Sequence, residues 1–448
     1  MNTGRGVDEP ARHTELYGEY DVAVIGGGPA GIAAAVGAAR HGARTILVER
    51  YGFLGGMGTA GGVTNFAGLY GRRDGQMQQL VRGVVDELLE RIKQRGGLNQ
   101  PQDGLQGRIR VRSYDIPAYK CAADQMLLSS GVELLFHAWA AAVVKAGGQT
   151  LDAVIVETKS GRRAVRALEF IDASGDADVA AFAGVPFELG DGAGSALYPS
   201  TMFRIGNVDA ERAEAAVGEF KAIDALMSAA ADRYDFPRQG AILRPQRNPR
   251  EWRANVTQLR NAQGLAVDAT DARQLSAAEV EGRRQIIEYM RFLRAEVPGF
   301  EAAELLDIGT QVGIRESRRV RGAYALSGDD VLGSARFDDA IGLNAWPLEV
   351  HAAGRIEWGF PRDADRAYNQ LPYRMLLPQG VANLHVVGRC ASMEHLGQSA
   401  ARASGGCFVM GQAAGTAAAL RLRGHLRGDV PISLLQSTLK RDGVELDL

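Results

Sequence analysis

The stretch YDVAVIGGGPAGIAAAVGAARHGARTILVE, residues 20–49, decides the fold of this chain. An apolar run leads into three glycines, Gly26, Gly28 and Gly31, then into an Ala-rich segment, and a second apolar run ends at Glu49. This order predicts a strand, a tight turn, a helix and a second strand. The unit is typical of dinucleotide-binding proteins. The alternative is a glycine-rich turn that binds no ligand, but it does not explain why an acidic residue, Glu49, stands at this distance.

Each glycine of the turn meets a different requirement. Gly26 allows a sharp turn after the strand, Gly28 lets the backbone approach a pyrophosphate, and Gly31 lets the helix pack closely on the strand. The helix that begins at Pro29 and Ala30 then offers unpaired N–H groups and the positive end of its dipole to phosphates.

The acid at Glu49 lies about 20 residues beyond the glycines, where a carboxylate accepts hydrogen bonds from ribose hydroxyls. An acid in this place argues against a site for NADP, whose extra phosphate is usually received by an arginine. The motif alone does not distinguish NAD from FAD.

Length and composition restrict the protein class further. A chain of 448 residues predicts two domains, and a net charge of -2 argues against nucleic-acid binding and polybasic membrane contacts. Residues 1–19 lack the apolar core of a signal peptide, and no later segment is long and apolar enough to span a bilayer. We therefore expect a disordered leader over 1–19, no membrane partner and a cytoplasmic location.

Nucleotide-type elements lie at both ends of the chain, and the middle mixes short strands with helices predicted at 209–232 and 277–297. The expected fold is α/β. A discontinuous Rossmann-type domain is formed by residues 20–190 and 372–448, and a β-rich α+β substrate domain is inserted at 191–371.

Several further segments, together with the opening motif, resemble the FAD-dependent oxidoreductases of the glutathione-reductase-like superfamily, in the subgroup with a GG-x-x-T loop. These segments are VERYGFLGGMGT (48–59), FIDASGDADVAAFAG (170–184), GIRESRRVRGAYALSGDDVL (313–332) and LPYRMLLPQGVANLHVVGRCAS (371–392), followed by GQAAGTAAAL (411–420). They follow the family's order over nearly the whole chain. The match is specific for fold and cofactor and says little about the substrate.

The resemblance implies where FAD would contact the chain. The first glycines would hold the pyrophosphate, the GG-x-x-T loop would line the path to the isoalloxazine, and the last Gly/Ala helix would point its N-terminus at the flavin pyrimidine. The implied cofactor residues are Gly26, Gly28, Pro29, Ala30, Gly31, Glu49, Arg50, Gly55, Gly56, Met57, Thr59, Ala173, Ser174, Gly175, Gly388, Arg389, Gly405 and Gly406.

The chain departs from its glutathione-reductase-type relatives in three ways. The loop GGMGTAGG (55–62) has no cysteine, so disulfide reduction is disfavoured, and the middle of the chain has no second glycine fingerprint for NAD(P)H. No histidine precedes the GG pair as in covalently flavinylated relatives, so we expect non-covalent FAD. The three cysteines show no short spacing that indicates a metal site.

Hydride removal from a substrate needs a base for the departing proton and groups that orient the substrate. Two histidines are candidates: His351, which forms a Glu-x-His pair with Glu349 like the family's Asp-x-His, and His395 in the loop after Gly388. Two residues apart on an extended segment, Glu349 and His351 face the same side. A structural role is the alternative for each histidine.

Arginines are dense around GIRESRRVRG (313–322), where most of them are expected to be solvated or ion-paired. Arg315 and Arg402 match recurrent arginines of the family and are candidates to hold a substrate carboxylate. The expected ligand is therefore a small organic molecule, and these arginines would suit an anionic one.

The leading hypothesis is an FAD enzyme that dehydrogenates such a molecule by hydride transfer to flavin N5, with O2 or another acceptor taking the electrons. A flavin monooxygenase that binds NAD(P)H transiently is the nearest alternative, since IDASGDAD (171–178) lies where hydroxylases of this superfamily carry a DG motif. The usual D-G-x-x-S followed by Arg is replaced here by Asp178-Val179-Ala180, which argues against it. An electron-relay flavoprotein is less favoured because clustered cysteines are absent. Exposed apolar helix faces in the middle domain would permit a homodimer.

Overall fold

A computed structural model describes residues 6–7, 9–218, 223–239, 242–424, 428 and 430–447. A seven-stranded sheet forms the centre of the fold, in the order β8-β2-β1-β11-β10-β9 with β22 beside β11. Its strands are β1 (Leu16–Ile25), β2 (Thr45–Val48), β8 (Glu133–Leu135), β9 (Trp139–Gly147), β10 (Thr150–Thr158), β11 (Gly161–Asp172) and β22 (Leu384–Val386). β8, β2, β1, β11 and β22 are parallel, whereas β10 is antiparallel to both of its neighbours.

The long strand β11 joins the two halves of the nucleotide domain. Its first half pairs with β10, and its last residues, Phe170 to Asp172, pair with β22 near the end of the chain. β1 lies along the other edge of β11, so sequence-distant strands share one sheet. The α/β fold with a discontinuous Rossmann-type sheet is therefore confirmed.

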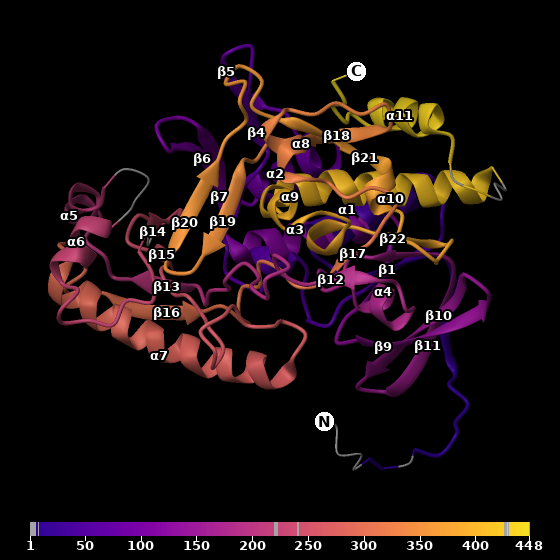
Figure 1. Cartoon of the computed structure of the whole chain (residues 1–448), viewed down its shortest axis with the longest axis horizontal. Helices are drawn as coiled ribbons and strands as arrows, with labels where there is room; N and C mark the ends of the chain where they lie inside the picture. The colour runs from indigo at the N-terminus through magenta and orange to yellow at the C-terminus, as the bar shows by residue number, and fades with distance from the viewer. Residues whose placement is uncertain are drawn as a thin grey trace.

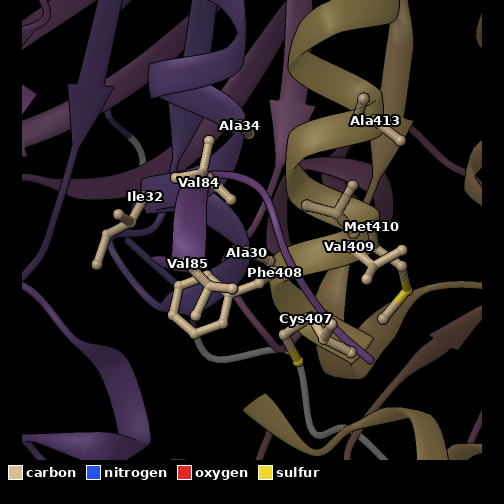
Figure 2. Packing of buried hydrophobic residues seen from close by; sticks show 14 of the residues in the cluster. Ala30, Ile32, Ala34, Val84, Val85, Cys407, Phe408, Val409, Met410 and Ala413 are labelled. Carbon is tan, nitrogen blue, oxygen red and sulfur yellow. The ribbon is translucent and has the colours of Figure 1, made fainter. Parts of the chain in front are cut away.

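Helix α1 (Pro29–Arg40) and helix α10 (Ser404–Arg423) pack against each other without large side chains between them. A Cβ added at Gly411 would overlap the backbone oxygen of Ala30, and one at Gly415 would overlap that of Ala34. Figure 2 shows Ala30 and Ala34 beside the helix that carries Met410 and Ala413. The Gly/Ala composition of α10 is thus a requirement of close helix contact.

A second layer covers the other side of the molecule. Strands β14 (Ile242–Pro245), β15 (Trp252–Asn255), β13 (Phe203–Gly206) and β16 (Glu304–Ile308) form an antiparallel sheet in that order. The long helix α7 (Ala272–Glu296) runs beneath this sheet (Figure 1). Trp252, Phe203 and Phe292 fill the core of this layer.

The remaining elements connect the two layers. Between β2 and β8 lie η1 (Gly56–Gly58), β3 (Asn65–Phe66), β4 (Tyr70–Arg73), β5 (Gln76–Gln79), α2 (Val84–Gln94), β6 (Leu98–Gly104), β7 (Ile109–Tyr114) and α3 (Ile116–Ser129). Later come α4 (Asp178–Phe182), β12 (Phe187–Glu188), α5 (Ala210–Ala216), α6 (Asp224–Ala229), β17 (Arg319–Val320), α8 (Gly328–Leu332), β18 (Ala340–Asn344), β19 (Leu348–Ala352), β20 (Arg355–Gly359), β21 (Asn369–Pro372), η3 (Tyr373–Leu376), η4 (Gly388–Cys390), α9 (His395–Ala401) and α11 (Ile432–Arg441).

Two expectations differ from the structure. β1 begins at Leu16, inside the expected leader, because Leu16 to Tyr20 pair with β11; residues 1–5 and 8 of that leader lie outside the described residues. The helix expected at 209–232 is wrong: α5 ends before Val217, which has an extended conformation, and α6 is a separate short helix. The helix expected at 277–297 is α7, and the domain boundaries stay a prediction.

The contact between α1 and α10 predicts a strong effect of Gly411→Val. The added side chain would force the helices apart, and overpacking of this kind destabilises by about 1–3 kcal/mol or more. The midpoint of thermal unfolding should fall by several degrees, and the affinity for FAD should also decrease. Gly428→Ala is the matched control, since its added Cβ meets no atom within 4 Å. An unchanged midpoint in the valine variant would contradict the assignment.

Candidate functional site

One cavity, with a volume of about 270 Å³, runs from the first glycine turn to the antiparallel sheet. Its walls come from both ends of the chain and from the middle. The turn after β1, the end of β2 and the segment 173–175 line one end, and β14, β15, β19 and the start of α10 line the other. The cavity therefore joins the expected cofactor elements to the inserted layer.

The first end of the cavity has the features of a phosphate and ribose site. Gly26 has a φ of 107°, and helix α1 starts at Pro29 with no side-chain cap and no acidic residue in its first turn. The Glu49 carboxylate accepts the N–H groups of Gly27 at 2.6 Å and Tyr51 at 2.9 Å. Burial raises the pKa of Glu49, and these N–H groups partly oppose that effect.

The geometry at the glycines fits FAD. A Cβ on Gly28 would meet only Gly56 Cα, at 3.7 Å, so the space in front of this residue belongs to the cavity. A Cβ on Gly31 would instead overlap the backbone oxygen of Gly26, so this glycine is needed for packing. An uncapped helix N-terminus beside open space is a place for a phosphate group.

The turn after β11 is held by charged pairs. Asp172 is fully buried and accepts hydrogen bonds from Ser174 N–H, Ser174 Oγ and Ala180 N–H. Arg389 forms an ion pair with Asp176 at 3.0 Å, and Arg50 lies 3.9 Å from the same carboxylate. Burial opposes ionisation of Asp176, but the two guanidinium charges outweigh it and lower its pKa.

Most expected cofactor residues lie on the cavity wall. These are Gly26, Gly28, Pro29, Ala30, Glu49, Arg50, Gly56, Met57, Ala173, Ser174, Gly175, Gly388 and Arg389. Gly31, Gly55, Thr59, Gly405 and Gly406 are not on the wall. Gly405, for example, donates its N–H to Ala67 oxygen at 2.9 Å, and a Cβ there would overlap Gly68. The start of α10 reaches the cavity through Ala403 and Ser404 instead.

Sequence reasoning missed an aromatic residue at the first end. Trp139 of β9 lines the cavity, and the Arg50 guanidinium carbon lies 5.3 Å from its ring centroid and 5.1 Å from that of Tyr51. Trp139 is 90 residues beyond the ribose acid in the sequence, and its apolar strand carries no local signal of a ligand. The backbone before Trp139 brings it to the site, since Ala138 N–H donates to the Glu49 backbone oxygen at 3.1 Å.

At the second end, Glu349 and His351 do lie together, as expected from the Glu-x-His pattern. His351 Nε2 lies 3.1 Å from Glu349 Oε1, and its Nδ1 lies 3.4 Å from Arg238. Because arginine only donates, Nδ1 must accept, and Nε2 carries the proton that is donated to Glu349. Trp346 Nε1 donates to the other carboxylate oxygen at 2.9 Å.

This hydrogen-bond chain determines the charge of both groups. Burial, followed by the charge of Arg315, lowers the pKa of His351 well below its usual value, so the ring is neutral. Burial opposes ionisation of Glu349, but the hydrogen bond donated by His351 and the charge of Arg402 outweigh it and lower its pKa. Both nitrogens of His351 are engaged, so the geometry does not favour it as the general base.

His395 is not brought to the cavity. Its Nδ1 lies 2.9 Å from Glu316 Oε2, and Glu316 also pairs with the buried Arg319. The fold turns the start of α9 toward this ion pair, which leaves His395 a structural role.

The two arginines expected to bind substrate, Arg315 and Arg402, both line the second end. Arg315 NH1 donates to Tyr198 oxygen and Ser200 Oγ, both at 2.7 Å. Sequence reasoning missed Arg244 and Arg253, which line the same wall from β14 and β15. Strand alternation could have placed them on one face, but which face meets the cavity depends on tertiary packing.

The sequence profile of the family described as FAD dependent oxidoreductase matches residues 21–439. The chain belongs to this family. As a member, it is an FAD-dependent oxidoreductase. No helix among the described residues is long and apolar enough to cross a membrane, and no group of their side chains forms a metal site.

Individual proteins resemble this chain only over a short segment or at low sequence identity. Mitochondrial dihydrolipoyl dehydrogenase of Schizosaccharomyces pombe is 59% identical over 39 residues, which are 9% of this chain and 8% of that protein. The geranylgeranyl bacteriochlorophyll reductase-like protein of Thermoplasma acidophilum has a TM-score of 0.49 at 13% identity, covering 95% of this chain and 84% of its own. The p-nitrophenol 4-monooxygenase of Pseudomonas putida DLL-E4 has a TM-score of 0.46 at 10% identity. The match covers 94% of this chain and 83% of that protein.

Substitution of Gly28, which faces the cavity, and of Gly31, which packs against Gly26, should have different effects. Gly28→Ala should fold normally, because its Cβ makes an ordinary contact, but its methyl group enters the cavity and should weaken FAD binding by about ten- to hundredfold. Gly31→Ala should lower the unfolding midpoint as well. FAD titration and thermal unfolding of both apoproteins separate these effects. Equal destabilisation of the two apoproteins would contradict this division.

The neutral state of His351 predicts a pH effect on stability. Its folded pKa lies below the unfolded value of 6.5, so the unfolded chain binds an extra proton as the pH falls below 6.5, and stability is lost. The stability advantage of the wild type over His351→Asn should therefore shrink by up to about 1.4 kcal/mol per pH unit between pH 6.5 and 5. Denaturant unfolding measures this difference. His385, whose pKa burial lowers to about 3, should behave alike, and a pH-independent difference would contradict the interpretation.

Proposed function

We propose that this chain binds FAD non-covalently and dehydrogenates a small organic anion by hydride transfer to flavin N5. The observation that supports the proposal is the continuous cavity, with Gly28 and Glu49 at one end and Glu349, Arg315 and Arg402 at the other. When bound, FAD supplies a two-electron acceptor for such a hydride. The protein's part is then to hold and orient the substrate.

The second end is suited to that task. Arg315 is fixed by Tyr198 and Ser200, and Arg402 donates to the backbone oxygen of Glu349 at 3.1 Å, so neither guanidinium needs to be ordered by the substrate. Fixed donors of this kind bind a carboxylate with less loss of entropy. Trp346, which is 5% exposed, adds an apolar surface to this part of the wall.

The proton that leaves with the hydride needs an acceptor other than His351, whose two nitrogens are engaged. Glu349 is ionised but is a weak base, because its pKa is lowered. We infer that these two residues position Arg238 and Arg402, and that solvent or the substrate's own carboxylate takes the proton.

The first test is the cofactor itself. Purified protein should be yellow and should release FAD on denaturation, and small anionic alcohols, amines or acids should bleach it under anaerobic conditions. Colourless protein that cannot be reconstituted would contradict the proposal. NADPH consumption without substrate would favour the monooxygenase alternative, and transfer of electrons only to a partner protein would favour the relay. The natural electron acceptor, a cytoplasmic location and a homodimer stay predictions.

Arg402→Ala tests the anion site. The variant should keep its FAD but need about ten- to hundredfold more substrate for half-maximal bleaching, since a charge-assisted hydrogen bond is lost. Arg212→Ala, which removes a surface arginine paired with Glu301, is the control and should match the wild type. Equal substrate dependence of the two variants would refute the role of Arg402.

A further inference from the structure

Five arginines gather at the second end of the cavity. Arg244, Arg253, Arg315 and Arg402 line the wall, and Arg238 lies behind it against His351. Arg238, Arg244, Arg253 and Arg315 are all 6% exposed or less. Buried guanidinium groups are normally paired one to one with carboxylates.

The described residues provide little negative charge here. Glu349 is the carboxylate of this part of the wall, and it acts electrostatically on all five arginines. Asp224 adds to its effect on Arg238, and Glu316 adds to it at Arg402, although Glu316 already pairs with Arg319 and His395. The other carboxylates that line the cavity, Glu49 and Asp178, belong to its first end.

The sheet places two of these charges directly opposite each other. Arg244 and Arg253 are cross-strand partners in the antiparallel pair β14–β15, so their side chains share a face. Like charges directly opposite on a sheet destabilise it. Burial, together with the charge of Arg244, lowers the pKa of Arg253 to about 9, a value at which it is still charged at neutral pH.

Arg253 also lacks a charged partner of its own. Its NH2 donates to Asn65 Oδ1 at 3.0 Å and its NH1 to Met202 Sδ at 3.2 Å, both neutral acceptors. Its Nε and the Nε of Arg402 are buried without a hydrogen-bond partner. Two arginine donors are thus left for a ligand, one on the sheet side and one beside Glu349.

We propose that this wall binds a compact organic dianion, with two acidic groups joined by a short apolar spacer, as the substrate of the enzyme. One acidic group would lie against Arg244 and Arg253, and the other against Arg315 and Arg402. The aromatic side chains of Trp346 and Trp358 line the same region and suit the spacer. Two negative charges are needed because a single carboxylate leaves most of the guanidinium charge uncompensated. This inference rests on the proposed function.

The test uses the FAD-loaded enzyme and calorimetric titration with succinate and glutarate, against butyrate and dimethyl succinate as the singly charged and neutral matches. Both dianions should bind at least about tenfold more tightly than butyrate, and added salt should weaken them more. Dianions that bind no more tightly than butyrate would overturn the proposal.

Arg253→Met separates a binding role from a structural one. Removing a repelled, unpaired charge should raise the unfolding midpoint of the ligand-free enzyme while weakening succinate binding at least about tenfold. Arg253→Lys should recover part of that binding, and Arg212→Met on the surface should change neither property. An Arg253→Met variant that binds succinate like the wild type would refute the site. If this variant does not fold, Arg253→Gln, which also removes the charge, gives the same two readings.

The outcomes also distinguish the two proposals. Protein that takes up no FAD refutes the proposed function, whatever binds at the arginines. Yellow protein that is bleached by singly charged organic anions but does not bind either dianion keeps the proposed function and refutes only the dianion site.

Discussion

The close contact of α1 with α10 is the constraint on which the rest of the structure depends. Gly411 and Gly415 meet the backbone of Ala30 and Ala34, so helices from the two ends of the chain touch with almost no side chain between them. This contact places the start of α10 beside the first glycine turn. The first glycine turn and the start of α10 line the cavity together with β14 and β15 of the inserted layer, so the middle of the chain completes its wall.

The two ends of the cavity satisfy their polar groups in different ways. At the first end every buried charge discussed above has a partner: Glu49 accepts two N–H groups, and Asp176 pairs with Arg389. At the second end the described arginines outnumber the described carboxylates, and Glu349 acts electrostatically on several guanidinium groups at once. A structure that retains such repulsion is expected where a ligand supplies the missing charge.

His351 was a candidate base for the departing proton, but the structure gives its neutral ring a different role. A ring held between a donor and a carboxylate fixes the position of both, but it has no nitrogen left for proton transfer. Its contribution is geometric, since it orients the one carboxylate on which the arginine wall depends.

The cofactor end could be predicted from sequence because its requirements are local. Gly26, Gly28 and Glu49 lie within one strand-turn-helix-strand unit, and backbone geometry forces glycine and acid into fixed positions. The roles of Gly405 and Gly406 were harder to assign, since a glycine needed for helix packing and one needed for ligand approach look the same in sequence.

By itself, the sequence determined the α/β fold, the family and FAD, because these follow from short-range backbone constraints repeated along the chain. Only the tertiary structure decided that His395 faces Glu316, that Trp139 reaches the cavity, and that Arg244 and Arg253 join Arg315 at one wall. These residues come from strands and loops far apart in the chain, and which of their faces meet depends on how two layers pack. No local sequence pattern specifies which faces meet.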